Sequence, residues 1–180
     1  RSPIDVYKPL KNLHIEEILS FKNVITVKLN EYYGLEPKDI NSYNFFMREN
    51  LFDHIDIPLE NINIPSGIIE PMKVRDYCKA YEKKIADLGG LDFQLLGIGR
   101  TGHVGFNEPG SNINSQTRLV SLDHLTRYDA AGAFHGIENV PSKAITMGIK
   151  TILSAKRIVL LAWGINKSEI IYKAVEGSIT

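Results

Sequence analysis

Residues 91–110 read LDFQLLGIGRTGHVGFNEPG, and this segment is the most informative one about the fold class. Its first six residues, 91–96, are mostly apolar and predict a short buried strand. A long segment rich in glycine and other turn-forming residues follows, from Gly97 to Asn114. In sheets built from parallel strands, ligands bind beyond the carboxyl ends of the strands, so this segment is the first place to look for a site.

Further along the chain in both directions, expected strands alternate with expected helices. The apolar patterns predict further strands at 24–29, 144–147 and 157–163, and helices at 3–19, 43–54, 71–88 and 166–176. This alternation predicts an α/β fold, a mostly parallel sheet with helices on both faces in a Rossmann-like three-layer arrangement. Polar clusters follow three of the strands, at Asn30-Glu31, at 97–108 and at 164–167, which favours one ligand-binding cleft.

Composition limits the class of protein. The 180 residues suffice for a single domain, 1–180, and 21 basic residues balance 21 acidic ones. Zero net charge argues against nucleic-acid or membrane-surface partners, and no apolar run reaches the length of a membrane span. The single Cys78 excludes an internal disulfide and a cysteine-rich zinc site, so we expect no metal and a reducing, cytoplasmic location.

The glycines invite a dinucleotide-binding interpretation that we reject. Gly97 to Gly102 matches G-x-G-x-x-G, and Asp123 lies about 20 residues further on, where that motif places its ribose-binding acid. The third glycine of that motif should open a helix that holds a pyrophosphate. Loop-forming residues follow here instead, so we expect no nicotinamide cofactor.

The pair His103 and Glu108 is more informative. The two side chains lie five residues apart on the glycine-rich loop. An imidazole, with an ordinary pKa of about 6.5, can move a proton in either direction near neutral pH, and a nearby carboxylate orients the ring and stabilises its charged form. The alternative is an ordinary surface histidine and a glutamate in a turn.

Around this loop the sequence resembles the glucosamine-6-phosphate deaminase (isomerase) family. The run LLGIGRTGHVGFNEPGS follows that family's GxGxxGHxxFNEP signature. Flanking matches occur in the same order: SPIDVYKPL, LNEYYGL, SYNFFMRENLFDHIDIP, VPSKAITMG and AWGINKSEIIYKAVEG. Relative to the family, we expect the chain to be incomplete at both ends, lacking the opening strand and most of the phosphate loop.

The resemblance implies a reaction and its residues. Family members convert glucosamine 6-phosphate and water to fructose 6-phosphate and ammonia without a metal or organic cofactor. Carried over by position, His103 assists ring opening and Glu108 tunes and orients it, while the backbone at Gly97 approaches the sugar. Lys167 and Ser2 are the expected phosphate contacts, so the expected partner is a small-molecule sugar phosphate. The family also makes a homo-oligomer possible.

Three positions depart from the family pattern. Asn30 stands where the family has the aspartate that acts as general base, and an amide cannot accept the C2 proton as a carboxylate does. Thr101 stands where many members have an aspartate beside the histidine. Gly132 stands where the family has a phosphate-binding arginine, although Arg127 could serve if the loop shifted. Loss of the base at position 30 predicts retained sugar-phosphate binding with most turnover removed.

Two alternatives remain open. One is a non-catalytic sugar-phosphate-binding protein, which needs no base. The other is a phosphogluconolactonase-like hydrolase, against which the FNEP sequence at 106–109 counts. Other features are expected to be structural, namely an inert buried Cys78, histidines without metal-ligand spacing, and the core aromatic residues Tyr32, Tyr33, Phe45, Phe46 and Trp163.

Overall fold

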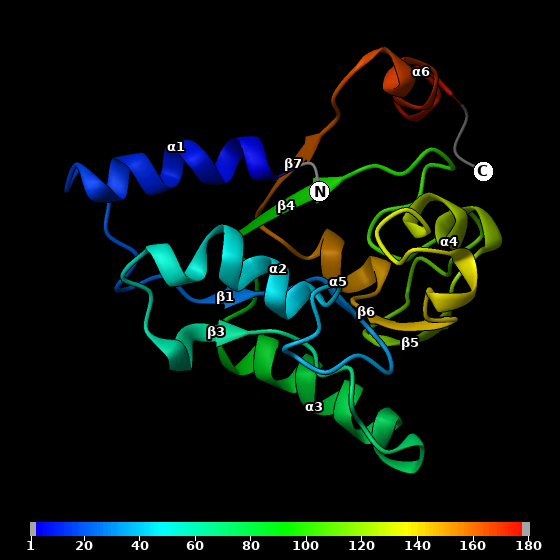
Figure 1. Ribbon diagram of the computed structural model, residues 1–180, viewed down its shortest axis with the longest axis horizontal. Coiled ribbons are helices and arrows are strands. Elements are labelled where there is room, and N and C mark those ends of the chain that lie inside the picture. The colour runs from blue at the N-terminus through cyan, green and yellow to red at the C-terminus, as the bar shows by residue number, and fades with distance from the viewer. Residues whose placement is uncertain (1–2, 178–180) are drawn as a thin grey trace.

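A computed structural model describes residues 3–177 (Figure 1). The helices are α1 (Ile4–Ile15), α2 (Tyr43–Asn50), α3 (Val74–Asp87), α4 (His124–Ala130), α5 (Ile149–Leu153) and α6 (Ser168–Glu176). The strands are β1 (Thr26–Val27), β2 (Asn30–Tyr32), β3 (Ile62–Asn63), β4 (Phe93–Gly97), β5 (Arg118–Ser121), β6 (Lys143–Thr146) and β7 (Arg157–Leu161). None of the helices in this part of the chain is both long and apolar enough to cross a membrane.

The strands pair in three groups. β1 pairs with β3, and β4 with β7, both in parallel. β6 lies between β2 and β5 and is antiparallel to both. The expected α/β class is confirmed, and the antiparallel group is an addition that alternation of strands and helices does not predict.

Helices cover the strands from two sides (Figure 1). On one side, α1 and α2 enclose an apolar cluster that reaches Ile62 of β3. On the other side, α3 packs Tyr81 and Ile85 against Leu96 at the end of β4. The helices expected at 3–19, 43–54 and 71–88 therefore form on the two faces, as the apolar pattern predicts.

Strand β2 was expected to be a polar exit from the preceding strand, and that expectation is wrong. Asn30, Glu31 and Tyr32 are all buried, and they pair residue by residue with β6. The Glu31 carboxylate accepts hydrogen bonds from three backbone N–H groups, those of Tyr32, Tyr43 and Asn44, at 2.8–2.9 Å. A polar residue is therefore buried here because it holds the start of α2 on β2.

The loop after β4 is fastened to the antiparallel strands. The Asn107 side-chain amide donates to the carbonyls of Val104 and Met147, and its oxygen accepts from Arg118 on β5. The backbone N–H of Phe106 donates to the Thr146 hydroxyl on β6. These bonds fix the turn that carries His103, and no helix opens at Gly102, as expected in rejecting the dinucleotide motif.

All but one of the expected core residues are buried or half-buried. Cys78 is buried, Tyr32 is 7% exposed, and Tyr33, Phe45 and Phe46 are half-buried. Trp163 is 52% exposed, so its assignment to the core is wrong for the part of the chain described. It follows β7, whose residues Arg157–Leu160 are themselves exposed, so the apolar run there does not lead into a packed interior.

Candidate active site

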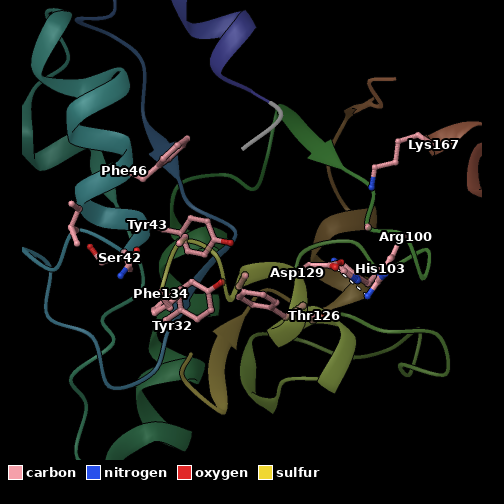
Figure 2. A pocket seen from close by; sticks show the side chains of 16 residues that line it. Tyr32, Ser42, Tyr43, Phe46, Arg100, His103, Thr126, Asp129, Phe134 and Lys167 are labelled. Atoms are coloured by element: carbon pink, nitrogen blue, oxygen red, sulfur yellow. Dashed lines mark ion pairs between the residues drawn. The ribbon is translucent and has the colours of Figure 1, made fainter. Parts of the chain in front are cut away.

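A cavity of about 410 Å³ lies between the start of α2, helix α4 and the loop after β4 (Figure 2). One part of its wall is aromatic and the other is polar. The aromatic part consists of Tyr32, Tyr43, Phe46, Phe106 and Phe134, and the polar part includes Arg100, His103, Thr126, Asp129 and Lys167. A wall of this composition suits a ligand with both a ring and charged groups.

His103 and Glu108 meet as the sequence predicts. Nδ1 of His103 lies 3.2 Å from Oε1 of Glu108, and both side chains are half-buried. The Thr101 hydroxyl lies 2.9 Å from the same Nδ1 and donates a 2.7 Å hydrogen bond to Oε2 of Glu108. Its only proton is therefore directed to the carboxylate, so it accepts from Nδ1–H of His103. Nε2 is left with a lone pair for proton exchange with a ligand.

Helix α4 contributes a second hydroxyl. Thr126 donates a 2.6 Å hydrogen bond to Oε1 of Glu108 and also lines the cavity. The carboxylate is thus held by one hydroxyl on each oxygen, which fixes its plane relative to the imidazole. Asp123 caps the start of α4 by accepting from the Leu125 N–H at 2.8 Å, so the residue that imitated a ribose-binding acid is a helix cap.

The glycines of the loop have different positions. Gly97 pairs with Leu161 at the end of β4 and does not line the cavity. Gly99 does line it, and a Cβ built there would lie 2.1–2.4 Å from ring atoms of His103. The His103 ring therefore packs directly on the backbone of Gly99, which no other residue type permits.

Two cations lie at the polar part of the cavity. Lys167 lines it and donates a 2.8 Å hydrogen bond to the carbonyl of Ile98. Arg100, which the sequence analysis did not single out, forms an ion pair with Asp129 of α4 at 3.1 Å, marked by the dashed line in Figure 2. In the sequence, only the position of Arg100 inside the glycine-rich loop could have indicated that it lies at the site.

The two other phosphate-binding expectations have different outcomes. Ser2 lies outside the described residues, so its role stays a prediction. Arg127 is held by hydrogen bonds from Nη2 to the carbonyls of Ile137 and Val140, at 2.9 and 3.2 Å. Arg127 therefore serves the turn after α4, and Gly132 in the same region is exposed. The described residues hold no cluster of His, Cys, Asp or Glu that could bind a metal ion.

Asn30 lies behind the aromatic wall. It is 4% exposed and pairs with Thr146 of β6, and it shares a sheet face with Tyr32, two residues further along. Since Tyr32 lines the cavity, Asn30 is directed to the same side of the sheet, although it is not itself part of the wall. Glu31 faces elsewhere and is occupied by backbone donors. Burial raises the pKa of its carboxyl, and those three hydrogen bonds oppose the rise.

Lys28 is a charged group near the site that the sequence analysis missed. Its Nζ lies 4.9 Å from the centre of the Tyr43 ring, and Tyr43 stacks on Tyr32 with ring centres 5.4 Å apart. Loss of solvent around the amine lowers the pKa of Lys28 to about 8, while the nearby Glu31 carboxylate opposes this shift. In the sequence, Lys28 is a single polar residue in an apolar strand, and no pattern distinguishes it from a lysine exposed to solvent.

Comparison with known proteins gives a consistent result. A family model described as glucosamine-6-phosphate isomerases/6-phosphogluconolactonase matches residues 1–179. Glucosamine-6-phosphate deaminases of Oceanobacillus iheyensis and Bacillus subtilis are 45% and 47% identical over 179 residues, 99% of this chain and 71% and 73% of theirs. A protein of Bacteroides thetaiotaomicron, named as glucosamine-6-phosphate deaminase-like, is 49% identical over 179 residues, but these make up only 27% of its length.

Solved structures agree. The structure of a monomeric glucosamine-6-phosphate deaminase superposes with a TM-score of 0.95 at 47% identity, over 99% of this chain and 73% of that one. A 6-phosphogluconolactonase from Trypanosoma cruzi superposes with a TM-score of 0.73 at 20% identity, over 99% of this chain and 70% of that one. The second similarity concerns the fold alone.

Proposed function

We propose, because the chain belongs to the glucosamine-6-phosphate isomerase/6-phosphogluconolactonase family, that its cavity converts glucosamine 6-phosphate and water to fructose 6-phosphate and ammonia. The observation that carries this proposal is the contact between His103 and Glu108, bridged by Thr101, at the wall of a cavity that also contains Lys167. This is the family's acid–base pair in a geometry that leaves one ring nitrogen free.

Ring opening is the step this geometry supports best. A proton must leave the C1 hydroxyl and a proton must reach the ring oxygen as the C1–O5 bond breaks. With Nδ1–H held by Thr101 and Glu108, Nε2 is the nitrogen that exchanges protons with the sugar. The positive charge that develops on the imidazole is stabilised by the Glu108 carboxylate at 3.2 Å.

Lys167 and the aromatic wall supply binding. An ammonium at the polar part of the cavity attracts the phosphate as a point charge. The aromatic part of the wall offers apolar surface to the sugar ring and its carbon chain. Ser2 belongs to this phosphate site in the same proposal.

Isomerisation and deamination follow ring opening. The C2 proton leaves, an enolamine forms, a proton returns at C1, and water releases ammonia from C2. Asn30 occupies the position of the family's base and cannot take that proton, so this step depends on another group. A non-catalytic sugar-phosphate-binding role is the second candidate, and Asn30 is the observation that favours it.

A cytoplasmic location and the oligomeric state complete the proposal. A buried Cys78 thiol agrees with a reducing compartment, where phosphorylated sugars are metabolised. The possible homo-oligomer stays a prediction, and the similar solved structure is of a monomeric deaminase. Sedimentation of the full-length polypeptide checks the state.

The test is a paired assay on the full-length polypeptide that carries this chain. Fructose 6-phosphate and ammonia are measured by coupled enzymes, and ligand binding is measured by calorimetry. We expect both products in equal amounts, and His103→Gln to lower kcat by about a hundredfold or more. The matched control is His124→Gln, since His124 is exposed at the start of α4. Binding without either product supports the binding-only candidate instead.

A further inference from the structure

Among the described residues 3–177, no free carboxylate at the cavity serves as a base for the C2 proton of the proposed reaction. The carboxylates around the cavity are already committed. Glu108 holds His103, Asp129 pairs with Arg100, and Glu31 accepts three backbone N–H groups. Asn30 is an amide. A site with a complete ring-opening pair and no base for the next step would stop at the open-chain aldose.

Lys28 does not itself line the cavity, but it lies close to Asn30 in the chain. It precedes Asn30 by two residues, between the end of β1 and the start of β2. Its main chain is fixed on both sides, because its N–H donates to the carbonyl of Asn63 at 2.7 Å and its carbonyl accepts from the Tyr81 hydroxyl at 2.8 Å. The side chain extends from this anchor to the ring of Tyr43, 4.9 Å away.

Tyr43 connects Lys28 to the cavity. Figure 2 shows the Tyr43 ring in the middle of the lining residues, with its hydroxyl directed toward the side of His103. An ammonium over an aromatic face is held by the charge distribution of the ring. Lys28 is therefore positioned against a wall residue.

The surroundings of Lys28 leave its amine unoccupied. Within residues 3–177, Nζ has the Tyr43 ring as its contact and neither a hydrogen bond nor an ion pair. The titratable groups packed around the residue are Glu31 on β2, Tyr43 on α2 and Tyr81 on α3, and only Glu31 is charged near neutral pH. A half-buried ammonium without a salt-bridge partner destabilises the folded state, so a functional role would explain its position.

We propose that Lys28 supplies the amine that removes the C2 proton of the open-chain amino sugar, in place of the carboxylate that Asn30 replaces. This inference rests on the proposed function. The inference extends the proposed function by naming the base for the C2 proton. Its geometrical support is the fixed backbone of Lys28 and its contact with a cavity-lining tyrosine, together with the lack of an ion-pair partner for its nitrogen among residues 3–177.

The step balances without a co-reactant. The lone pair of neutral Lys28 takes the C2 proton, the C2–H electrons form the C1–C2 double bond, and the C1 carbonyl oxygen receives a proton from the imidazolium form of His103, which takes a proton back from the water that adds at C2. The enolamine then takes the same proton from the Lys28 ammonium at C1, which leaves an iminium at C2. Water adds at C2, and the C2–N bond then breaks to release ammonia as the C2 carbonyl of the ketose forms. A pKa of about 8 leaves about a tenth of the amine neutral at pH 7, and more as pH rises.

The experiment compares Lys28→Met and Lys28→Arg in the full-length polypeptide, with Lys38→Met as the control, since Lys38 is an exposed lysine. We expect both Lys28 variants to lose about 10²–10⁴-fold in kcat with KM within threefold, and Lys38→Met to match the wild type. The wild-type kcat should rise with pH through about 8. Exchange of the C2 proton with deuterated water, followed by NMR, should be lost along with kcat.

Lys28→Arg separates chemistry from structure. An arginine keeps the positive charge over Tyr43 but does not give up its proton, so it cannot serve as a base. Full activity in Lys28→Arg, or unchanged C2 exchange in Lys28→Met, overturns the inference. The double variant Lys28→Met/Asn30→Asp should recover turnover without the rise through pH 8.

The outcomes also separate this inference from the proposed function. If Asn30→Asp releases fructose 6-phosphate while the wild type does not, the function stands and the role of Lys28 is wrong. If neither protein nor the double variant releases product, the proposed function itself is wrong, and the base with it.

Discussion

The Thr101 hydroxyl lies 2.9 Å from Nδ1 of His103 and decides which ring nitrogen carries the proton. Because that hydroxyl gives its own proton to Glu108 at 2.7 Å, it accepts from the imidazole. Thr101 stands where many members of the family have an aspartate beside the histidine. In the structure the threonine joins His103 and Glu108, so the relay has three members and one carboxylate.

Removal of this bridge is the first prediction. Thr101→Val keeps the shape of the side chain but leaves Glu108 with one hydroxyl donor instead of two. A hydrogen bond to a charged group contributes about 1.5–3 kcal/mol, so we expect kcat to fall by roughly ten- to a hundredfold with KM nearly unchanged. Steady-state kinetics measure this, with Thr26→Val as the control. An unchanged kcat shows that Glu108 orients the imidazole without help.

Gly99 gives a second prediction. An alanine methyl at this position would overlap the His103 ring, from which the added Cβ would be 2.1–2.4 Å away. Either the ring or the loop must move, so Gly99→Ala should lower kcat by about a hundredfold and the free energy of unfolding by about 1–3 kcal/mol.

Gly132→Ala is the matched control for Gly99→Ala, because a Cβ there meets nothing within 4 Å. Circular dichroism and thermal unfolding check that both variants fold. Wild-type turnover in Gly99→Ala means that the position of the imidazole in the apo protein is not the one used in the reaction.

Much of the fold could be predicted from apolar periodicity. The helix expected at 71–88 contains α3 at Val74–Asp87, and the strand expected at 91–96 is β4, displaced by one or two residues. These elements have one buried face each, which produces a regular pattern. His103 and Glu108 could be paired because they share one short loop.

The parts that were missed depend on tertiary contacts. The sequence of β2 does not look like a strand, because it contains Glu31. This glutamate is buried to accept hydrogen bonds from backbone N–H groups, a role that leaves no periodic pattern in the sequence. Asp123 could have indicated the start of helix α4, but the same residue also fits the dinucleotide-binding motif. Only the structure shows that Asp123 caps the helix, by accepting the Leu125 N–H. The role of Lys28 could not be predicted from the sequence for a similar reason, since the residues around it belong to α2 and α3.

Restoration of the carboxylate at position 30 is the third prediction. Asp is fully ionised at pH 7, and at this position it shares the sheet face of Tyr32 at the cavity. Asn30→Asp should raise kcat at least tenfold while KM changes by less than about threefold. Asn114→Asp is the control, since Asn114 is exposed on a loop. No gain means that the base lies elsewhere or that phosphate binding limits the rate.

Lys28 also makes a prediction about stability. Its pKa is about 8 in the folded protein and 10.5 in an exposed lysine, so the unfolded chain binds the proton more tightly. Below pH 8 both states are protonated and the full cost of the half-buried charge is present. Between about pH 8 and 10.5 the unfolded state carries more protons than the folded state, so the contribution of Lys28 to the free energy of unfolding rises with pH.

Lys28→Met removes this cost. At pH 7 we expect the variant to exceed the wild type by about 2 kcal/mol in free energy of unfolding, less than the pKa difference alone implies because water reaches the amine and the contact with Tyr43 is lost. The advantage should shrink as the pH rises toward 10.5. Urea unfolding at pH 7, 8.5 and 10 measures it, with Lys38→Met beside it. Other groups whose pKa is raised by folding, such as Cys78 and Tyr81, are common to all three proteins and cancel in the differences. A constant difference across these pH values, or a variant less stable than the wild type at pH 7, contradicts a lowered pKa at Lys28.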